Sequence, residues 1–165
     1  MAPLLTWSEK MSVGVEALDA DHRKLMTYVN DLHAAVRGKA APADIGRILD
    51  ELIAYTEYHF EVEERLQKLA RYPHLDDHRQ AHEALKQKVY ALRERFRADP
   101  KALNSIKVFD FLTDWLVRHI LGDDMKYKPF LERKPAAAAA PATPPAPAPA
   151  PAPTPAKTKD EAGTG

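Results

Sequence analysis

Apolar residues recur at helical rather than strand spacing from about Asp19 to about Leu131, and helix-breaking residues divide this region into four stretches. We expect helices over residues 19–37, 42–70, 76–97 and from 103 or 104 to about 122, followed by a short amphipathic segment over 126–131. Four helices joined by short connections predict an all-α, up-down-up-down four-helix bundle, in which neighbours pack about 20° from antiparallel.

Local signals mark the ends of these helices. Asp19 suits the N-cap or first turn of the first helix, and Gly38 stands where that helix would stop. Pro42 favours the first turn of the second helix. Residues 1–18, which include the apolar Val13, are expected to form an ordered arm laid across the bundle.

The prolines divide the chain into two parts. Nine of the 14 prolines follow Lys134, and residues 135–165 largely alternate Ala and Pro, with almost nothing to bury. We therefore expect a bundle domain over residues 1–134 and a disordered, semi-extended tail over residues 135–165. Two interpretations of the tail stay open, a spacer or docking arm and an inert solvated extension.

Composition excludes several kinds of partner and site. The 24 Lys and Arg balance 24 Asp and Glu, so no nucleic-acid partner is expected. No run of about 18 apolar residues occurs, and the N-terminus lacks the basic and apolar regions of a signal peptide, so we expect a cytoplasmic protein without membrane insertion. Because the chain has no Cys, any metal must be held by His and carboxylates.

Polar residues interrupt the apolar stripes of all four predicted helices. His59 and Glu63 are four residues apart, about 40° around the helix axis and about 6 Å along it, so both can reach one centre. His78 and His82 repeat this spacing on the next helix. A buried imidazole or carboxylate costs several kcal/mol unless something satisfies it, and a metal ion would do so.

The first and last helices each add an imidazole, His22 and His119. Asp124 follows His119 by five residues and would point about 140° away in a continuous α-helix. It can join the others only if the helix loosens at Gly122, which glycine permits.

Each of these features taken alone has an ordinary explanation. A single His on an apolar stripe is more often a satisfied core residue, a His pair is more often surface polarity, and Glu63 beside Glu61 and Glu64 is more often solvated. Together, antiparallel helices would bring all of them to one end of the bundle. Five imidazoles and two carboxylates exceed the needs of one ion and suit two first-row metals bridged by the carboxylates. This nitrogen-rich set favours dioxygen binding over oxygenase chemistry.

The chain resembles the hemerythrin family, specifically the bacteriohemerythrins. The resemblance covers about residues 7–131 and follows the order H…HxxxE…HxxxH…HxxxxD, with all seven ligand positions occupied. It rests on Trp7, the segment Ser12–His22, His59-Phe-Glu-Val-Glu63-Glu64, Tyr72-Pro73, His78-Arg-Gln-Ala-His82, Trp115-Leu-Val-Arg-His119-Ile and the segment Asp124–Leu131.

The resemblance implies a di-iron centre with an oxo or hydroxo bridge, and assigns each position a role. His78, His82 and His119 would hold one iron, His22 and His59 the other, while Glu63 and Asp124 would bridge the pair. Dioxygen would bind reversibly at the open position of the two-His iron. The family's oxygen pocket corresponds to four apolar residues, which pack as ordinary core at the same time, namely Phe60, Trp115, Leu116 and Ile120. His33 and His74 match no ligand position.

The leading hypothesis is therefore an oxygen carrier, storage protein or donor to an oxygen-consuming protein, expected to be a monomer and not an enzyme. One alternative is a di-metal hydrolase, or an oxidoreductase handling peroxide or nitric oxide. Against it, we expect no acid or base on the stripes beyond the seven ligands. Another alternative is an oxygen- or redox-sensing module, although no signalling domain follows the tail.

Overall fold

The computed structural model describes residues 2–104 and 106–133, and the predicted disordered tail over 135–165 lies outside these residues. The long helices are α1 (Glu16–Arg37), α2 (Pro42–Leu69), α3 (Leu75–Ala98) and α4 (Ile106–Arg118). A π-helical segment, η3 (His119–Asp124), joins α4 to the short helix α5 (Met125–Glu132). The described residues also form two 3-10 turns, η1 (Glu9–Met11) and η2 (Pro100–Asn104).

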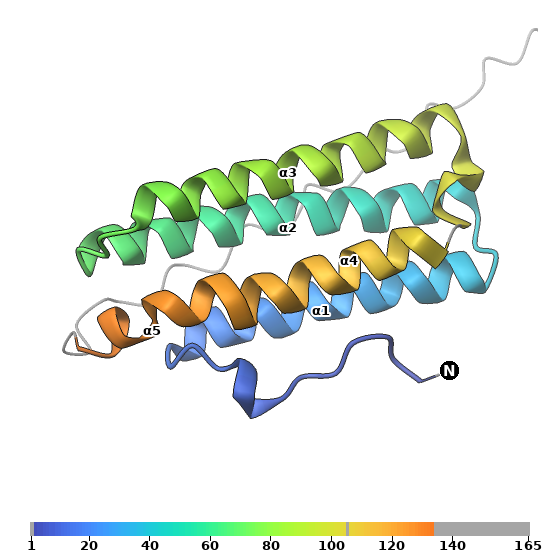
Figure 1. The fold of residues 1–165 in the computed structure, drawn as a ribbon. Coiled ribbons are helices and arrows are strands. Elements are labelled where there is room, and N and C mark those ends of the chain that lie inside the picture. Colours follow the sequence, from blue (N-terminus) through green and yellow to red (C-terminus); the bar gives the residue numbers. More distant parts are fainter. Residues whose placement is uncertain (1, 105, 134–165) are drawn as a thin grey trace, which may run out of the picture.

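The four long helices run side by side as a bundle (Figure 1). The helix α2 packs against both α1 and α3, while α4 packs against α1. No strand occurs in the described part of the chain, so the predicted all-α four-helix bundle is confirmed. Among the helices that the structure describes, none combines the length and apolarity needed to cross a bilayer.

The first helix begins earlier than expected, and Asp19 is not its cap. The N-cap residue of α1 is Val15, which makes no side-chain cap hydrogen bond. The buried Asp19 carboxylate instead accepts hydrogen bonds from the Val13 N–H at 2.8 Å and from the Ser12 hydroxyl at 2.6 Å. Asp19 therefore ties the N-terminal arm to α1 from within the helix, because its side chain turns back along the chain.

Gly38 is the C-cap residue of α1, as expected, but it keeps a right-handed conformation with φ of −75°. The left-handed residue is Lys39, with φ of 55°. The Ala40 N–H then donates to the Ala35 carbonyl at 2.9 Å, which satisfies a carbonyl of the last turn. The end of α1 is thus closed by backbone hydrogen bonds rather than by a left-handed glycine.

The expected N-terminal arm is present and ordered along the bundle (Figure 1). The Asn30 side chain of α1 accepts from the Leu5 N–H at 2.8 Å and donates to the Leu5 carbonyl at 2.9 Å. The Arg23 guanidinium lies 4.6 Å from the centre of the Trp7 ring. The arm is therefore fixed by side chains of α1 at several points.

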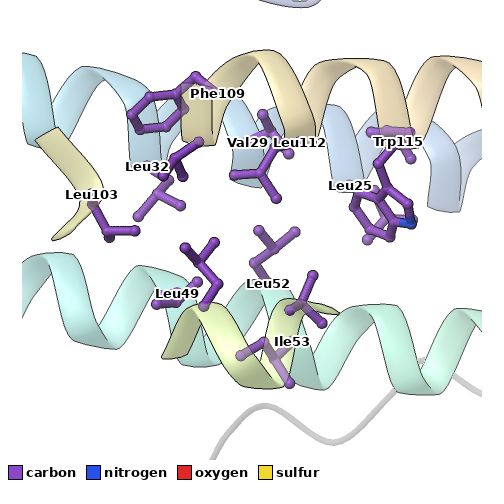
Figure 2. Close-up of a cluster of buried hydrophobic side chains, with 14 of the residues drawn as sticks. Leu25, Val29, Leu32, Leu49, Leu52, Ile53, Leu103, Phe109, Leu112 and Trp115 are labelled. Carbon is purple, nitrogen blue, oxygen red and sulfur yellow. The ribbon is translucent and has the colours of Figure 1, made fainter. Parts of the chain in front are cut away.

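The core falls into two clusters on either side of a polar layer. The larger cluster holds leucines and isoleucines from α1, α2 and α4, among them Leu25, Leu52 and Leu112 (Figure 2). The smaller cluster includes Leu18 and Tyr127 and closes the end of the bundle where the arm enters α1. Leu18 and Leu25 belong to different clusters, and the buried His22 lies between them on α1.

Candidate metal centre

The helices α1 and α2 bring the first three of the predicted residues together. His22 lies on the second turn of α1, and His59 and Glu63 lie one turn apart near the end of α2. His22, His59 and Glu63 all have 0% of their surface exposed. The His22 and His59 rings meet edge to face with their centres 4.6 Å apart, so both imidazoles enter the same space between the helices.

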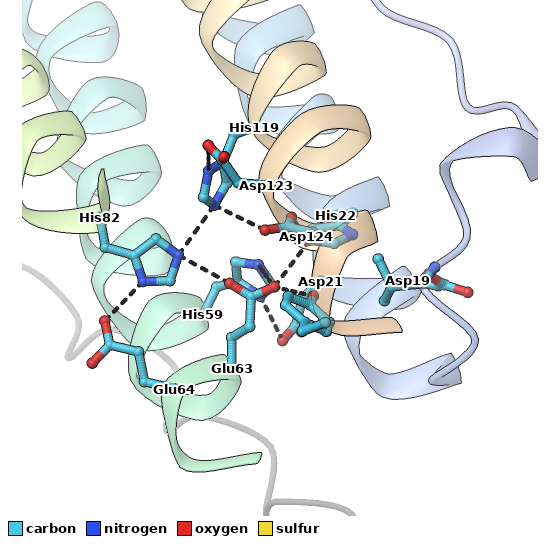
Figure 3. A network of polar contacts seen from close by, with 12 residues as sticks. Asp19, Asp21, His22, His59, Glu63, Glu64, His82, His119, Asp123 and Asp124 are labelled. Atoms are coloured by element: carbon cyan, nitrogen blue, oxygen red, sulfur yellow. Dashed lines mark hydrogen bonds and ion pairs between the residues drawn. The ribbon is translucent and has the colours of Figure 1, made fainter. Parts of the chain in front are cut away.

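The helix α3 and the π-helical segment η3 supply the other four from the opposite side. His78 and His82 lie on the first two turns of α3, and His119 and Asp124 lie at the two ends of η3. All four side chains are buried. The Nε2 atoms of His82 and His119 are 3.1 Å apart, and a dashed line in Figure 3 marks this contact. The structure thus brings all seven predicted residues to one end of the bundle.

The π-helical segment explains how Asp124 reaches this centre. In a π-helix the hydrogen bonds run from residue i to residue i+5, so His119 and Asp124 come onto one face. The expected loosening is therefore found, spread over six residues. A Cβ added at Gly122 would meet nothing within 4 Å, so the space around Gly122 does not require a glycine.

Glu63 and Asp124, the two carboxylates of the centre, each face two groups of imidazoles. One oxygen of Glu63, Oε2, lies 3.2 Å from His78 Nε2 and 3.0 Å from His82 Nε2. The other oxygen, Oε1, lies 3.9 Å from His22 Nε2 and 3.8 Å from His59 Nε2. Glu63 is therefore placed between the imidazoles of α1 and α2 and those of α3.

Asp124 repeats this arrangement from the other side. Its Oδ2 lies 3.2 Å from His22 Nε2, whereas its Oδ1 lies 3.1 Å from His119 Nε2 and 3.5 Å from His78 Nε2. Two groups of converging ligand atoms result, and Glu63 contributes to both. One group contains Glu63, His78, His82, His119 and Asp124, and the other contains His22, His59 and Glu63.

Several buried ligand atoms at the centre lack a hydrogen-bond partner, which bears on whether a metal ion fits there. The inward atoms His22 Nε2, His59 Nε2 and both oxygens of Asp124 are buried without a hydrogen bond of acceptable geometry. Leaving such groups unsatisfied costs about 1–3 kcal/mol each. Two ligand atoms at right angles on a cation with bonds of about 2.1 Å lie about 3.0 Å apart, close to the spacings found here. A cation would satisfy these atoms together, so the residues fit a metal.

The protonation of the metal-free centre follows from its charges. Burial opposes ionisation of Glu63, but the surrounding imidazoles of His59, His78 and His82 hold the pKa of its carboxyl well below the usual value. Burial lowers the pKa of His59. For His119 burial acts in the same direction, yet the carboxylates of Asp124 and Asp123 raise its pKa to about 9.

His22 behaves like His119, because Asp124 and Glu63 outweigh its burial and raise its pKa. His119 of the metal-free centre therefore favours the protonated form at neutral pH, and the pKa of His22 is shifted in the same direction. Metal ligands must be deprotonated, so metal binding must release the proton of His119.

Sequence reasoning missed several residues that touch the seven. Asp21, Glu64 and Asp123 lie beside the outer nitrogens of His59, His82 and His119. The expectation about acids was limited to the stripes themselves, and it did not cover these flanking carboxylates. One signal could have found them, since each follows or precedes a predicted ligand in the chain.

Tyr127 of α5 was also missed as a functional residue. It is fully buried, and its hydroxyl donates a hydrogen bond to Glu63 Oε1. Burial and the adjacent Glu63 carboxylate raise its pKa well above the usual value, so the phenol stays protonated as a donor. Tyr127 does not stand at a four-residue spacing from any predicted ligand, so the sequence gives no sign of its role. Only the packing of α5 against α2 brings its hydroxyl to Glu63.

The four apolar residues predicted to line an oxygen pocket are all buried in the larger core cluster (Figure 2 shows Trp115). Phe60 stacks on the His82 imidazole, with ring centres 3.7 Å apart and planes 3° from parallel, and meets the edge of His119 at 5.5 Å. Trp115 and Leu116 of α4 and Ile120 of η3 are at most 5% exposed. They form an apolar wall on one side of the polar layer.

The two remaining histidines lie apart from the centre. His33 is half-buried, with its ring edge-on to Phe109 at 4.9 Å. His74 is exposed in the turn before α3 and pairs with Asp77 at 3.6 Å. Neither takes part in the two groups of converging ligand atoms.

The chain is similar to known proteins of one metal-binding family. The hemerythrin HHE cation binding domain matches residues 13–131. A bacteriohemerythrin of Stenotrophomonas maltophilia is 34% identical over 124 residues, which cover 75% of this chain and 79% of the relative. A bacteriohemerythrin of Pseudomonas aeruginosa is 33% identical over 123 residues, covering 74% of this chain and 78% of the relative. A hemerythrin-like protein of Naegleria gruberi is 30% identical over 125 residues, covering 76% and 92%.

Solved structures show the same relationship. A crystal structure of wild-type hemerythrin superposes with a TM-score of 0.69 at 30% identity, covering 78% of this chain and 98% of that chain. A hemerythrin variant with a leucine changed to alanine superposes with a TM-score of 0.70 at 28% identity, covering 79% and 98%. The chain therefore belongs to the hemerythrin family of non-haem iron-binding proteins.

Proposed function

We propose that this protein binds dioxygen reversibly at a non-haem di-iron centre, for oxygen carriage, storage or delivery to an oxygen-consuming protein. The observation that carries the proposal is the position of Glu63 and Asp124. Each turns one oxygen toward His22 and the other toward the imidazoles of α3 and η3. Carboxylates in this position suit a bridge between two metal ions rather than the ligation of one.

We assign the seven residues to two ions, and the two groups of converging ligand atoms support this division. His78, His82 and His119 would hold one iron, while His22 and His59 would hold the other, and Glu63 and Asp124 would bridge them. When two irons are bound, the pair supplies the electrons on which reversible dioxygen binding depends. The iron held by His22 and His59 would have fewer protein ligands, which would leave it a position open to dioxygen.

The surrounding apolar residues would keep water and protons away from this position. Phe60 covers one face of the His82 ring, and Leu116 and Ile120 are at most 1% exposed. Water that enters would favour irreversible oxidation of the centre, so a dry wall supports reversible binding rather than turnover. We assign Phe60, Trp115, Leu116 and Ile120 this role. The family's general part in oxygen binding supports the same reading.

The test is an optical titration of the reduced, iron-loaded protein with dioxygen, followed by deoxygenation. A visible absorption band that appears with oxygen and disappears on its removal supports reversible binding. Steady oxygen consumption without recovery of the deoxygenated spectrum would instead indicate an enzyme.

The ligand assignment has its own test in the amount of bound iron. His78→Ala and His82→Ala should each lower it well below two ions per chain, because each removes a nitrogen from the five-residue group. His74→Ala is the matched control, since this imidazole is exposed and lies outside both groups. Full iron content in both His78→Ala and His82→Ala would refute the assignment.

A further inference from the structure

Two carboxylates lie just outside the centre and hold the outer nitrogens of two inward imidazoles. Asp21 Oδ2 lies 3.3 Å from His59 Nδ1, and Glu64 Oε1 lies 2.7 Å from His82 Nδ1 (Figure 3). Both contacts cross between helices, from α1 to α2 and from α2 to α3. Each carboxylate is the chain neighbour of an inner residue, His22 or Glu63, and so sits at the flank of the same layer.

A second donor holds each of these carboxylates from the other side. The Tyr55 hydroxyl donates to Asp21 Oδ1 at 2.7 Å. The Arg79 guanidinium donates to Glu64 Oε2 at 3.2 Å. Because both oxygens are engaged, the carboxylates cannot turn freely, and the oxygen facing the imidazole stays in place.

The chemistry of imidazole gives this arrangement a consequence. A neutral imidazole has one N–H and one lone pair, and a carboxylate can only accept a hydrogen bond. Asp21 and Glu64 therefore favour the form of His59 and His82 that carries its proton on Nδ1. The lone pair of Nε2 then points inward, toward Glu63 and the other converging ligand atoms.

We propose that Asp21 and Glu64 are positioning residues that set the tautomer and ring orientation of His59 and His82 before metal binds. The proposal rests on the proposed di-iron centre, in which His59 and His82 belong to different irons. One imidazole in each half of the centre is thus held from outside, His59 by a carboxylate of α1 and His82 by a carboxylate of α2. Mutation of outer carboxylates of this kind typically weakens metal affinity about 10–100-fold.

The contact between Asp123 and His119 is weaker and provides an internal comparison. Asp123 Oδ2 lies 3.4 Å from His119 Nδ1, but this nitrogen has no hydrogen bond of acceptable geometry. Both residues belong to the same π-helical segment, so no second helix is fixed by the contact. Asp123→Ala should therefore affect the centre less than Glu64→Ala.

The primary experiment reads the tautomers in the metal-free protein, by long-range ¹H–¹⁵N NMR correlation of the imidazoles at alkaline pH. In the unaltered chain His59 and His82 should carry their protons on Nδ1. Asp21→Ala should change only the His59 pattern, and Glu64→Ala only that of His82. Nε2–H forms in the unaltered chain, or patterns that the two variants leave unchanged, would overturn the proposal.

Fe²⁺ affinity provides the second readout, measured anaerobically by competition with a chromogenic chelator. Each alanine variant should weaken binding about 10–100-fold. Glu64→Gln should restore most of the affinity, because its amide oxygen can accept the same hydrogen bond from Nδ1. If Glu64→Gln is as weak as Glu64→Ala, charge rather than positioning is responsible and the proposal fails. Glu61→Ala, an exposed carboxylate on the same helix, is the matched control and should bind Fe²⁺ normally.

Tyr55→Phe keeps the proposal testable if Asp21→Ala does not fold. It retains the ring and removes only the hydroxyl that holds Asp21, so the His59 pattern should become mixed while that of His82 stays unchanged. An unaltered His59 pattern in Tyr55→Phe would count against the positioning role. The NMR measurement needs neither iron nor oxygen, so its failure is distinct from failure of reversible oxygen binding.

Discussion

Removal of the Tyr127 hydroxyl tests how much the buried Glu63 carboxylate depends on its neighbours. In Tyr127→Phe the ring stays in the smaller core cluster, and only the donor to Glu63 Oε1 is lost. The other groups near this oxygen, His22 Nε2 at 3.9 Å and His59 Nε2 at 3.8 Å, are too far away to replace it. The substitution therefore leaves one oxygen of a buried charge without a hydrogen-bond donor.

The expected cost follows from the charge of the acceptor. A hydrogen bond to a charged group contributes about 1.5–3 kcal/mol, so metal-free Tyr127→Phe should lose about that much stability. For a domain of this size, about 4 °C of Tm per kcal/mol converts this loss to a decrease of about 6–12 °C. The iron-loaded protein should lose less, because bound metal also compensates the charge of Glu63.

The assay is thermal unfolding followed by circular dichroism, with and without iron. Tyr72→Phe is the matched control, since Tyr72 lies in the same cluster with its ring centre 6.3 Å from that of Tyr127. In the described part of the chain, its hydroxyl makes no hydrogen bond to Glu63. Equal Tm decreases in the two metal-free variants would refute the reasoning, because the hydroxyl contact with Glu63 would then have no specific value.

Four further outcomes are expected. Leu116→Ala, at a 1% exposed core position, should cost about 2–5 kcal/mol in urea unfolding and shorten the lifetime of the oxygenated form, because water gains access. Asn30→Ala removes both hydrogen bonds to Leu5, so limited proteolysis should cleave the arm while the helix content stays unchanged. Deletion of residues 135–165 should alter neither Tm nor iron content. Metal-free protein should lose stability as pH rises from 6.5 to about 9. Folding raises the pKa of His119 to about 9, so its contribution to stability is fully present below pH 6.5 and is lost as pH rises through about 9. His59, whose pKa is lowered, adds no pH dependence of stability in this range. Iron loading should abolish the pH dependence, and urea midpoints of the metal-free and iron-loaded protein measure both effects.

Much of the fold followed from residue order because helices are local structures. The stretches around Leu25, Leu52 and Leu112 repeat apolar residues at helical spacing, and α2 and α3 begin and end within one residue of expectation. The error at Asp19 has a tertiary cause. Its carboxylate serves the arm residues Ser12 and Val13 rather than the helix terminus, and this contact depends on where the arm lies.

The sequence alone determined the list of seven polar residues at inward positions, because a four-residue spacing places two side chains on one helix face wherever that helix lies. It also predicted that Asp124 needs a loosened helix. Only the tertiary structure decided that Glu63 and Asp124 each face two groups of imidazoles, since that depends on four helices meeting at one depth. The same holds for Asp21, Glu64 and Tyr127, whose partners lie on other helices, and contacts between helices have no period along the chain.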